Sequence, residues 1–510
     1  MIHFLGFYSK PMFRDFAIVF EGGYRLLNGQ VPYNDFFIPM GPVIFYMQAM
    51  FMYFFGPNLL SMCLHSGALA ILLCASFFYL ITLYLNRFYA YVYAIALYFS
   101  FNGYFNYPFY SVSHAFFFFL ITIVFILIVL KKPALLKRSH SLVICAILTV
   151  LSIFTRQDVG MMQLVGLLLF FTVILRWPIR SVFACFLVPT LLGVVGISTW
   201  LESLGSFLYW FNWGQGTQPT RLDVLLTVET FKVWSQSLYA YMIFFFSVLL
   251  FYKPNERARI ALVIVIMGVV LISERLTSVN APISAQGIPI VVWVIHGLLM
   301  PILTPTLLKT GVVFVLLLWC NVLPLFGRYT VGNILFPFEG ETELSKRLKE
   351  GRRVSRHKPV RFFSDWMAGI SERTIPDYTR VRTGAYAGAL ILKSHLDDLN
   401  KIRAILDQVD GDFLNLTEYQ FLSADYDRDP SLGMPLAFHE GVYFQKHDLP
   451  RILTQVVALT PMVILLQNHL SHTDPKTHEA VCSFLLASGY NQTHQFQAPS
   501  MRPIKVFQKR

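Results

Sequence analysis

A polytopic α-helical membrane bundle with a C-terminal soluble α/β domain is the fold class that the sequence predicts, on three observations. Hydrophobic residues make up 55% of the 510 residues and charged residues only 14%, whereas a soluble domain carries about 25% charge. Apolar runs recur as far as residue 327, and residues 328–510 then hold 23 Lys and Arg with 20 Asp and Glu. This composition argues against a disordered protein, a nucleic-acid binder and a soluble cytosolic enzyme.

About ten membrane spans are predicted, since roughly 20 apolar residues fit a bilayer and shorter runs can serve inside a bundle. The segment 42–55 is short and is stopped by Gly56-Pro57, so we expect a helix that lies in the membrane interface. The ten expected spans are about 59–85, 88–102, 111–130, 141–154, 161–175, 181–200, 233–252, 260–272, 283–300 and 306–326.

The orientation follows from the basic residues, which favour the cytoplasmic side. Alternate loops carry eleven of the 18 basic residues of 1–327, and the opposite loops carry eight of its nine acids. The basic set is Arg87, Lys131, Lys132, Lys137, Arg138, Arg176, Arg180, Lys253, Arg257, Arg259 and Lys309. The expected domains are therefore an extracytoplasmic loop with a juxtamembrane helix (1–58), the transmembrane bundle (59–327) and an extracytoplasmic α/β domain (328–510). An exposed N-terminus at this position leads us to expect one further helix before Met1.

The C-terminal domain is predicted to alternate helices with short buried strands, which is typical of a small α/β layer structure. A charged connector covers 339–358. The expected helices are about 394–409, 448–458 and 475–488, and the apolar runs are 360–363, 413–416, 462–466 and 504–507.

The chemistry is expected at the outer membrane boundary. Transporters usually place ionisable groups near the midplane of their spans, whereas these spans are nearly free of charge and the acids lie in loops. In the richest loop, Asp15 precedes an amphipathic stretch that ends at Leu27. Helix capping in a solvated loop is the structural alternative for any one of these acids.

The loop resembles the first extracytoplasmic loop of the GT-C superfamily, membrane glycosyltransferases that use polyprenyl-phosphate-linked sugars. Protein O-mannosyltransferases and the aminoarabinose transferases of lipid A are members. The resemblance is specific over about 15–57, topological as far as 327, and weak over the C-terminal domain. Its matching residues, in order, are Asp15, Gly29, Pro32, Tyr33, Asp35, Pro42 and Phe55-Gly56.

The resemblance implies an integral enzyme of the bacterial plasma membrane that moves a sugar from a polyprenyl-phosphate carrier to an extracytoplasmic glycan, lipid or protein. Asp15 takes the role of general base, and membrane lipids but no nucleic acid are the other expected partners. Arg156 and Arg275 are the candidates for binding the donor phosphate. For each arginine, a snorkelling interfacial side chain or a pair with the adjacent acid is the alternative.

The sequence departs from the family where relatives often carry a second acid, because Ser111-Val112-Ser113-His114 stands there. If a divalent cation is used, Asp35, His114 and Asp158 are its candidate ligands. A lone histidine is more often simply hydrogen-bonded.

Two other classes of function remain open. A non-catalytic lipid or glycan transporter of the envelope predicts polar groups deep within the spans. A structural or assembly protein predicts no enclosed cavity around Asp15.

Overall fold

The computed structural model of the 510-residue chain is mostly helical, with sheets in its C-terminal region. The structure describes residues 15–82, 86–103, 111–131, 137–213, 378–409, 411–417, 419, 421–436, 438, 444–467, 475–496 and 504–509.

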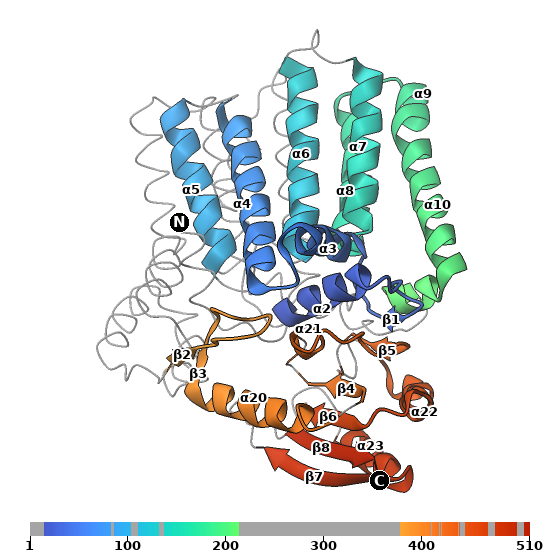
Figure 1. Ribbon diagram of the computed structural model, residues 1–510. Coiled ribbons are helices and arrows are strands. Elements are labelled where there is room, and N and C mark those ends of the chain that lie inside the picture. Colours follow the sequence, from blue (N-terminus) through green and yellow to red (C-terminus); the bar gives the residue numbers. More distant parts are fainter. Residues whose placement is uncertain are drawn as a thin grey trace, which may run out of the picture.

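Long apolar helices stand side by side in the N-terminal half (Figure 1). Each of the first six predicted spans coincides with one of them, and the last four, from 233 to 326, lie outside the described residues. The helices are α4 (Leu59–Thr82), α5 (Arg87–Gly103), α6 (Ser111–Lys131), α7 (Arg138–Ile153), α8 (Gln157–Leu169), α9 (Ile179–Val182) and α10 (Val188–Leu204). A π-helical turn, Phe170–Ile174, extends α8, and another, Phe183–Leu187, joins α9 to α10.

Two helices of the described part are long and apolar enough to cross a membrane, Leu59–Thr82 and the continuous Ile179–Leu204. Only 17% of the most apolar 18-residue stretch of the second helix is buried, and side chains such as Leu192 and Val195 are exposed. A helix that is apolar on its exposed side is typical of a membrane span. The shorter apolar helices are Val43–Phe55, His114–Leu130, Arg138–Ile153 and Val159–Ile174.

Helices α2 (Asp15–Leu27) and α3 (Val43–Phe55) run across one end of the upright helices (Figure 1). The stretch predicted from Asp15 to Leu27 and the short segment 42–55 are both helical. Backbone hydrogen bonds fix this end: Val43 N–H donates to Phe154 O at the end of α7 (3.4 Å), and Ser206 N–H beyond α10 donates to Tyr33 O (3.0 Å). The C-terminal region lies at the same end, since Leu59 N–H of α4 donates to Ala385 O (2.7 Å).

Two of the basic residues, Arg87 and Arg138, lie at the other end of the helices. Because α4 begins, and α7 and α10 end, beside the C-terminal region, Arg87 and Arg138 open their helices at the far end. There the Arg138 guanidinium lies 5.0 Å from the centre of the Trp177 ring. Among the described helices, the chain direction therefore places Arg87 and Arg138 away from the C-terminal region.

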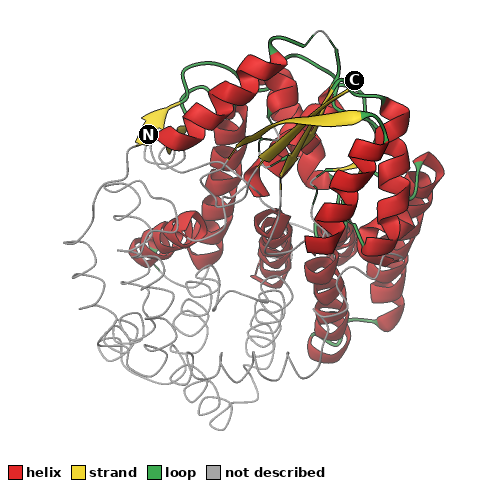
Figure 2. Cartoon of the chain, turned by 90° about the horizontal axis from the view of Figure 1, so that it is seen from below, coloured by secondary structure: helices red, strands yellow, loops and turns green. Residues whose placement is uncertain are grey.

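Strands of the C-terminal region form a four-stranded sheet (Figure 2). Its strand order is β4 (Phe413–Leu416), β6 (Val463–Gln467), β8 (Ile504–Lys509) and β7 (Tyr490–Phe496). Strands β4 and β6 are parallel, whereas β6–β8 and β8–β7 are antiparallel. Three of the predicted apolar runs are strands β4, β6 and β8, and the run 360–363 lies outside the described residues. Strand β7 was not predicted.

Helices cover both faces of this sheet. Because side chains alternate along a strand, Val463 and Leu465 of β6 pack with α20 (Lys393–Leu406), while Ile464 and Leu466 pack with α22 (Leu449–Leu459) and α23 (Pro475–Ala487). The remaining elements are β1 (Phe36–Phe37), β2 (Tyr378–Arg380), β3 (Leu390–Leu392), α21 (Leu422–Asp425) and β5 (Met434–Pro435).

The two hydrophobic clusters on either side of this sheet, one beneath α20 and one beneath α22 and α23, extend into the N-terminal loop. The α20 side continues through Phe20 and Tyr24 of α2, and the α22 side continues through Ile18, Tyr33 and Phe36. The loop and the C-terminal region therefore share their hydrophobic cores, although more than 300 residues separate them in the sequence.

Candidate functional site

Helix α2, which Asp15 opens, is the structural centre of the candidate site. One face of the helix packs on α3 at very short distance, because Gly22 presents no side chain there. A Cβ atom at Gly22 would lie 2.1 Å from Cδ1 of Phe45, so only glycine fits this crossing. The Asp15 side chain lies outside what the structure describes, and its backbone forms the first residue of α2.

A neighbouring face of α2 carries a buried ion pair directed at the C-terminal region. Arg25 Nε donates to Glu21 Oε1 (3.0 Å), one helical turn earlier, and the two residues are only 6% and 2% exposed. Arg25 Nη1 donates to Ser431 O (2.7 Å) and to Gln30 Oε1 (3.1 Å). Gln30 Nε2 in turn donates to Pro430 O (2.5 Å). One guanidinium thereby joins the helix, the loop after it and the C-terminal segment.

Burial dominates the electrostatics of this pair. It raises the pKa of the Glu21 carboxyl, and the charge and hydrogen bond of Arg25 offset part of that effect. Glu21 Oε2 is buried and has no hydrogen-bond partner among the residues that the structure describes. A buried charge without its partner is costly, so Arg25 is required for an ionised Glu21.

The loop after α2 is held by its own polar groups. Asp35 Oδ2 accepts the N–H of Val31 (2.7 Å), and Asp35 Oδ1 accepts a hydrogen bond from Asn34 Nδ2 (2.9 Å). The buried Tyr33 has a positive φ of 67° and donates its hydroxyl to Met40 O (2.6 Å). These contacts give the Asp35 carboxylate a role in the loop itself.

A second backbone connection binds the loop to the C-terminal region. Strand β1 pairs in parallel with β5, placing Phe36 opposite Met434 and Phe37 opposite Pro435. Gly433 N–H donates to Asp35 O (2.6 Å), and Leu436 N–H donates to Phe37 O (3.0 Å). We call residues 428–436 the docking segment, because the hydrogen bonds of Arg25 and Gln30 also end on it.

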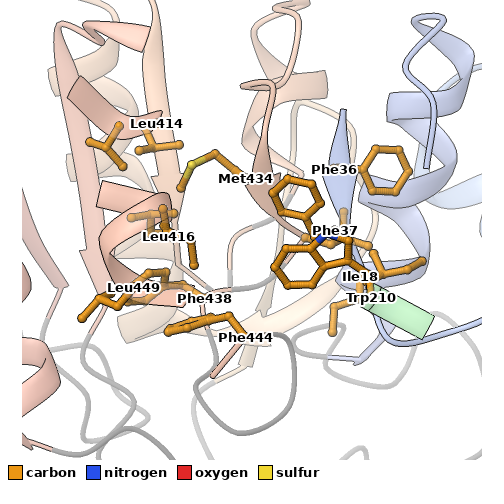
Figure 3. Packing of buried hydrophobic residues seen from close by; sticks show 14 of the residues in the cluster. Ile18, Phe36, Phe37, Trp210, Leu414, Leu416, Met434, Phe438, Phe444 and Leu449 are labelled. Atoms are coloured by element: carbon orange, nitrogen blue, oxygen red, sulfur yellow. The ribbon is translucent and has the colours of Figure 1, made fainter. Parts of the chain in front are cut away.

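Aromatic side chains close the other side of this junction (Figure 3). The rings of Phe37 and Trp210 stack with centroids 4.3 Å apart, and the Arg451 guanidinium lies 5.1 Å from the Phe37 ring and 5.8 Å from the Trp210 ring. Next to them Tyr209 donates its hydroxyl to Asp448 and lies 2.9 Å from His447 Nε2. The chain beyond α10 is thus tied to the beginning of α22.

The candidate phosphate-binding residues are only partly described. Arg156 precedes α8 at the end of the helices that adjoins the C-terminal region, and its N–H donates to Ser152 O (2.8 Å). Asp158 lies in the first turn of α8, but its side chain is outside the described set, and Arg275 is outside it entirely.

His114 lies beside a second histidine that the sequence did not single out. Its Nε2 is 2.9 Å from Nε2 of His65 in α4, and both rings are fully buried. Gln48 of α3 adjoins the first of these rings: its Nε2 donates to Ser61 Oγ (3.3 Å), and its Oε1 lies 2.8 Å from His65 Nδ1. This chain of polar contacts joins α3 to α4 and α6.

A second buried polar group lies between α6, α7 and α8. Gln163 Nε2 donates to Thr122 Oγ1 (3.0 Å) and to Thr149 Oγ1 (3.1 Å). The helices therefore enclose more polar groups than the near absence of charge suggested. Over the residues described, no group of three or more His, Cys, Asp or Glu side chains could hold a metal ion.

Sequence reasoning missed Glu21, Arg25 and His65. Glu and Arg at i and i+4 on a predicted helix are a recognisable pair signal, whereas a single histidine in an apolar run gives no sign of its partner 49 residues later.

Comparison with known proteins adds no family: no protein-family model matches the chain, and no curated protein matches it significantly.

Proposed function

We propose that the chain is a multi-pass glycosyltransferase of the bacterial plasma membrane that moves a sugar from a polyprenyl-phosphate carrier to an extracytoplasmic glycan, lipid or protein. Its loop 1–58 and C-terminal region face outward in this proposal, and its basic loops face the cytoplasm.

One observation carries the proposal. Asp15 opens a helix that is enclosed between α3 and the C-terminal region, at the end of the apolar helices remote from Arg87 and Arg138. A helix that begins with an acidic residue at the boundary between apolar helices and the C-terminal region suits an enzyme that takes a lipid-linked donor and a water-soluble acceptor.

In the proposed reaction the Asp15 carboxylate takes the proton of an acceptor hydroxyl or amine. The acceptor then attacks the anomeric carbon while the bond to the polyprenyl phosphate breaks, which inverts the configuration. General base catalysis by a positioned side chain typically contributes about 10²–10⁴-fold. Arg156 and Arg275 would neutralise the charge that develops on the leaving phosphate.

Asp35 is the weaker candidate for this role, because its carboxylate already accepts the N–H of Val31 and the amide of Asn34. We keep it as a substrate or divalent-cation candidate together with His114 and Asp158.

Transfer from a synthetic short-chain polyprenyl-phosphate sugar by the purified chain in lipid nanodiscs tests the proposal. Its acceptor is first identified from a deletion strain, in which one envelope sugar should be missing and its carrier should accumulate. Asp15→Asn preserves the shape without a usable base, so transfer should fall by about two to four orders of magnitude.

Asp407→Asn is the matched control, since Asp407 is exposed at the end of α20, remote in sequence from the loop. Near-normal transfer by Asp15→Asn would refute the assignment.

A transporter of lipids or glycans is the second candidate, favoured by the buried polar groups around His65 and Gln163. It predicts movement of the lipid-linked sugar between leaflets in proteoliposomes, unaffected by Asp15→Asn.

A further inference from the structure

The buried groups on α2 bear on how the candidate base is held. Asp15 and Arg25 are ten residues apart on one 13-residue helix, a distance of about 15 Å along its axis. A change of about ten degrees in the direction of the helix at Arg25 would move its first residue by about 2.5 Å. Errors as small as about 1 Å in a reacting group can cost up to about 100-fold in rate.

Two independent contacts restrict the direction of α2. The close crossing at Gly22 and Phe45 fixes the distance between α2 and α3. The polar contacts at Glu21, Arg25 and Gln30 are directional, because each donor has a defined acceptor in the helix, the loop or the docking segment.

We propose that Arg25 is a positioning residue for Asp15, and that the docking segment 428–436 takes part in this positioning through its contacts with Arg25 and Gln30. This inference rests on the proposed function. The guanidinium donates hydrogen bonds to three acceptors, Glu21 Oε1, Gln30 Oε1 and Ser431 O. These bonds set the rotation of α2 against the C-terminal region. The C-terminal region then acts on the reaction through α2, in addition to any contact with the acceptor.

Lysine at this position would keep the charge but replace the planar fork of the guanidinium by a single point donor. It would reach Glu21 and lose the defined geometry at Gln30 and Ser431. The helix would remain folded on α3, and its direction would no longer be fixed.

The test is a double-mutant cycle of Arg25→Lys and Asp15→Asn, measured as steady-state transfer from the synthetic donor in nanodiscs at varied donor concentration. A positioning residue acts through Asp15, so Arg25→Lys should lower kcat about ten- to 100-fold with KM unchanged. In the Asp15→Asn background the same change should cost less than about twofold, because the two effects are not additive.

Equal losses in both backgrounds would overturn the positioning role and leave the proposed function standing. Absence of transfer by the parent chain would instead overturn the proposed function, and this inference with it.

Two further variants serve as a control and as an independent test of the positioning role. Arg403→Lys is the matched control, because Arg403 pairs with the buried Asp425 (2.5 Å) within the C-terminal region and has no hydrogen bond to α2 among the described residues. Gln30→Leu removes the contact to Pro430 and one acceptor of Arg25 Nη1, while the hydrogen bond from Arg25 Nε to Glu21 is kept. It should show the same non-additive pattern even if Arg25→Lys lowers the yield of folded protein, and an additive loss would again refute positioning.

Discussion

Replacing Trp210 by alanine measures how firmly the C-terminal region is joined to the helices. Trp210 is fully buried, stacks on Phe37 and lies under the Arg451 guanidinium. Truncation of a buried Trp costs about 3–5 kcal/mol, because the surrounding groups cannot collapse into the space. Phe37 and Arg451 come from the first loop and from α22, so the loss falls on the junction itself.

Hydrogen exchange of the junction amides is the assay. Leu436 and Gly433 donate to Phe37 O and Asp35 O, and Ser206 donates to Tyr33 O, so these three amides exchange when the junction opens. A loss of about 3–5 kcal/mol lowers their protection by about two to three and a half orders of magnitude.

Two further substitutions at tryptophan make the result specific. Trp210→Phe should cost much less, because a ring remains to stack on Phe37 and Nε1 has no hydrogen-bond partner within the described part of the chain. Trp200→Ala is the matched control, since Trp200 is 53% exposed on α10. Unchanged protection in Trp210→Ala, or an equal loss in Trp200→Ala, would refute the role assigned to this residue.

Three other perturbations are informative. Arg25→Ala leaves the buried Glu21 carboxyl without its cation, and burial already raises the pKa of that group above its unfolded value. The folded state then keeps a proton that the unfolded chain has released, so protease resistance of the junction should fall as pH rises above the ordinary titration range of a glutamate; the double variant Glu21→Gln/Arg25→Ala should lose this dependence. Gly41→Ala would place a Cβ 1.9 Å from Phe154 O and should lower the thermal midpoint, whereas Gly196→Ala meets nothing within 4 Å and should not; equal midpoints would contradict the packing of the loop on α7. For topology, Ala458→Cys on the exposed side of α22 should react with an impermeant thiol reagent in intact cells and Ser139→Cys at the start of α7 should not; the reverse pattern would invert the proposed orientation.

The helices of the first half could be predicted because length and apolarity are local properties of the sequence. Predicting the helices at the first six expected spans needed only the recurrence of apolar runs, and the interruption at Gly56-Pro57 separated α3 from α4. The strands β4, β6 and β8 were predictable for the same reason, since they are short, buried and apolar. Strand β7 was missed because it lies at the sheet edge with mostly exposed polar residues, so its sequence carries no apolar run.

The contacts that build the candidate site have no local signature. A Glu and an Arg one turn apart predict a surface pair, and only the fold shows that Ser431 O and Pro430 O enclose them. Backbone acceptors leave no mark on a sequence, because every residue carries one. The pairing of His65 with His114 depends likewise on the packing of α4 against α6.

The pairing of β1 with β5 has a consequence for biosynthesis. Gln30 and Pro430, which meet at this junction, are 400 positions apart, and translation proceeds at about 5–20 residues per second. The first loop therefore waits roughly 20–80 seconds for its partner strand after it is made. During that interval Phe36 and Phe37, both buried in the finished protein, have no native surface from the C-terminal region to cover them. We expect a chaperone or the membrane surface to cover them in that interval, and a nascent chain truncated before Met434 should be far more sensitive to proteolysis in this loop than the full-length protein.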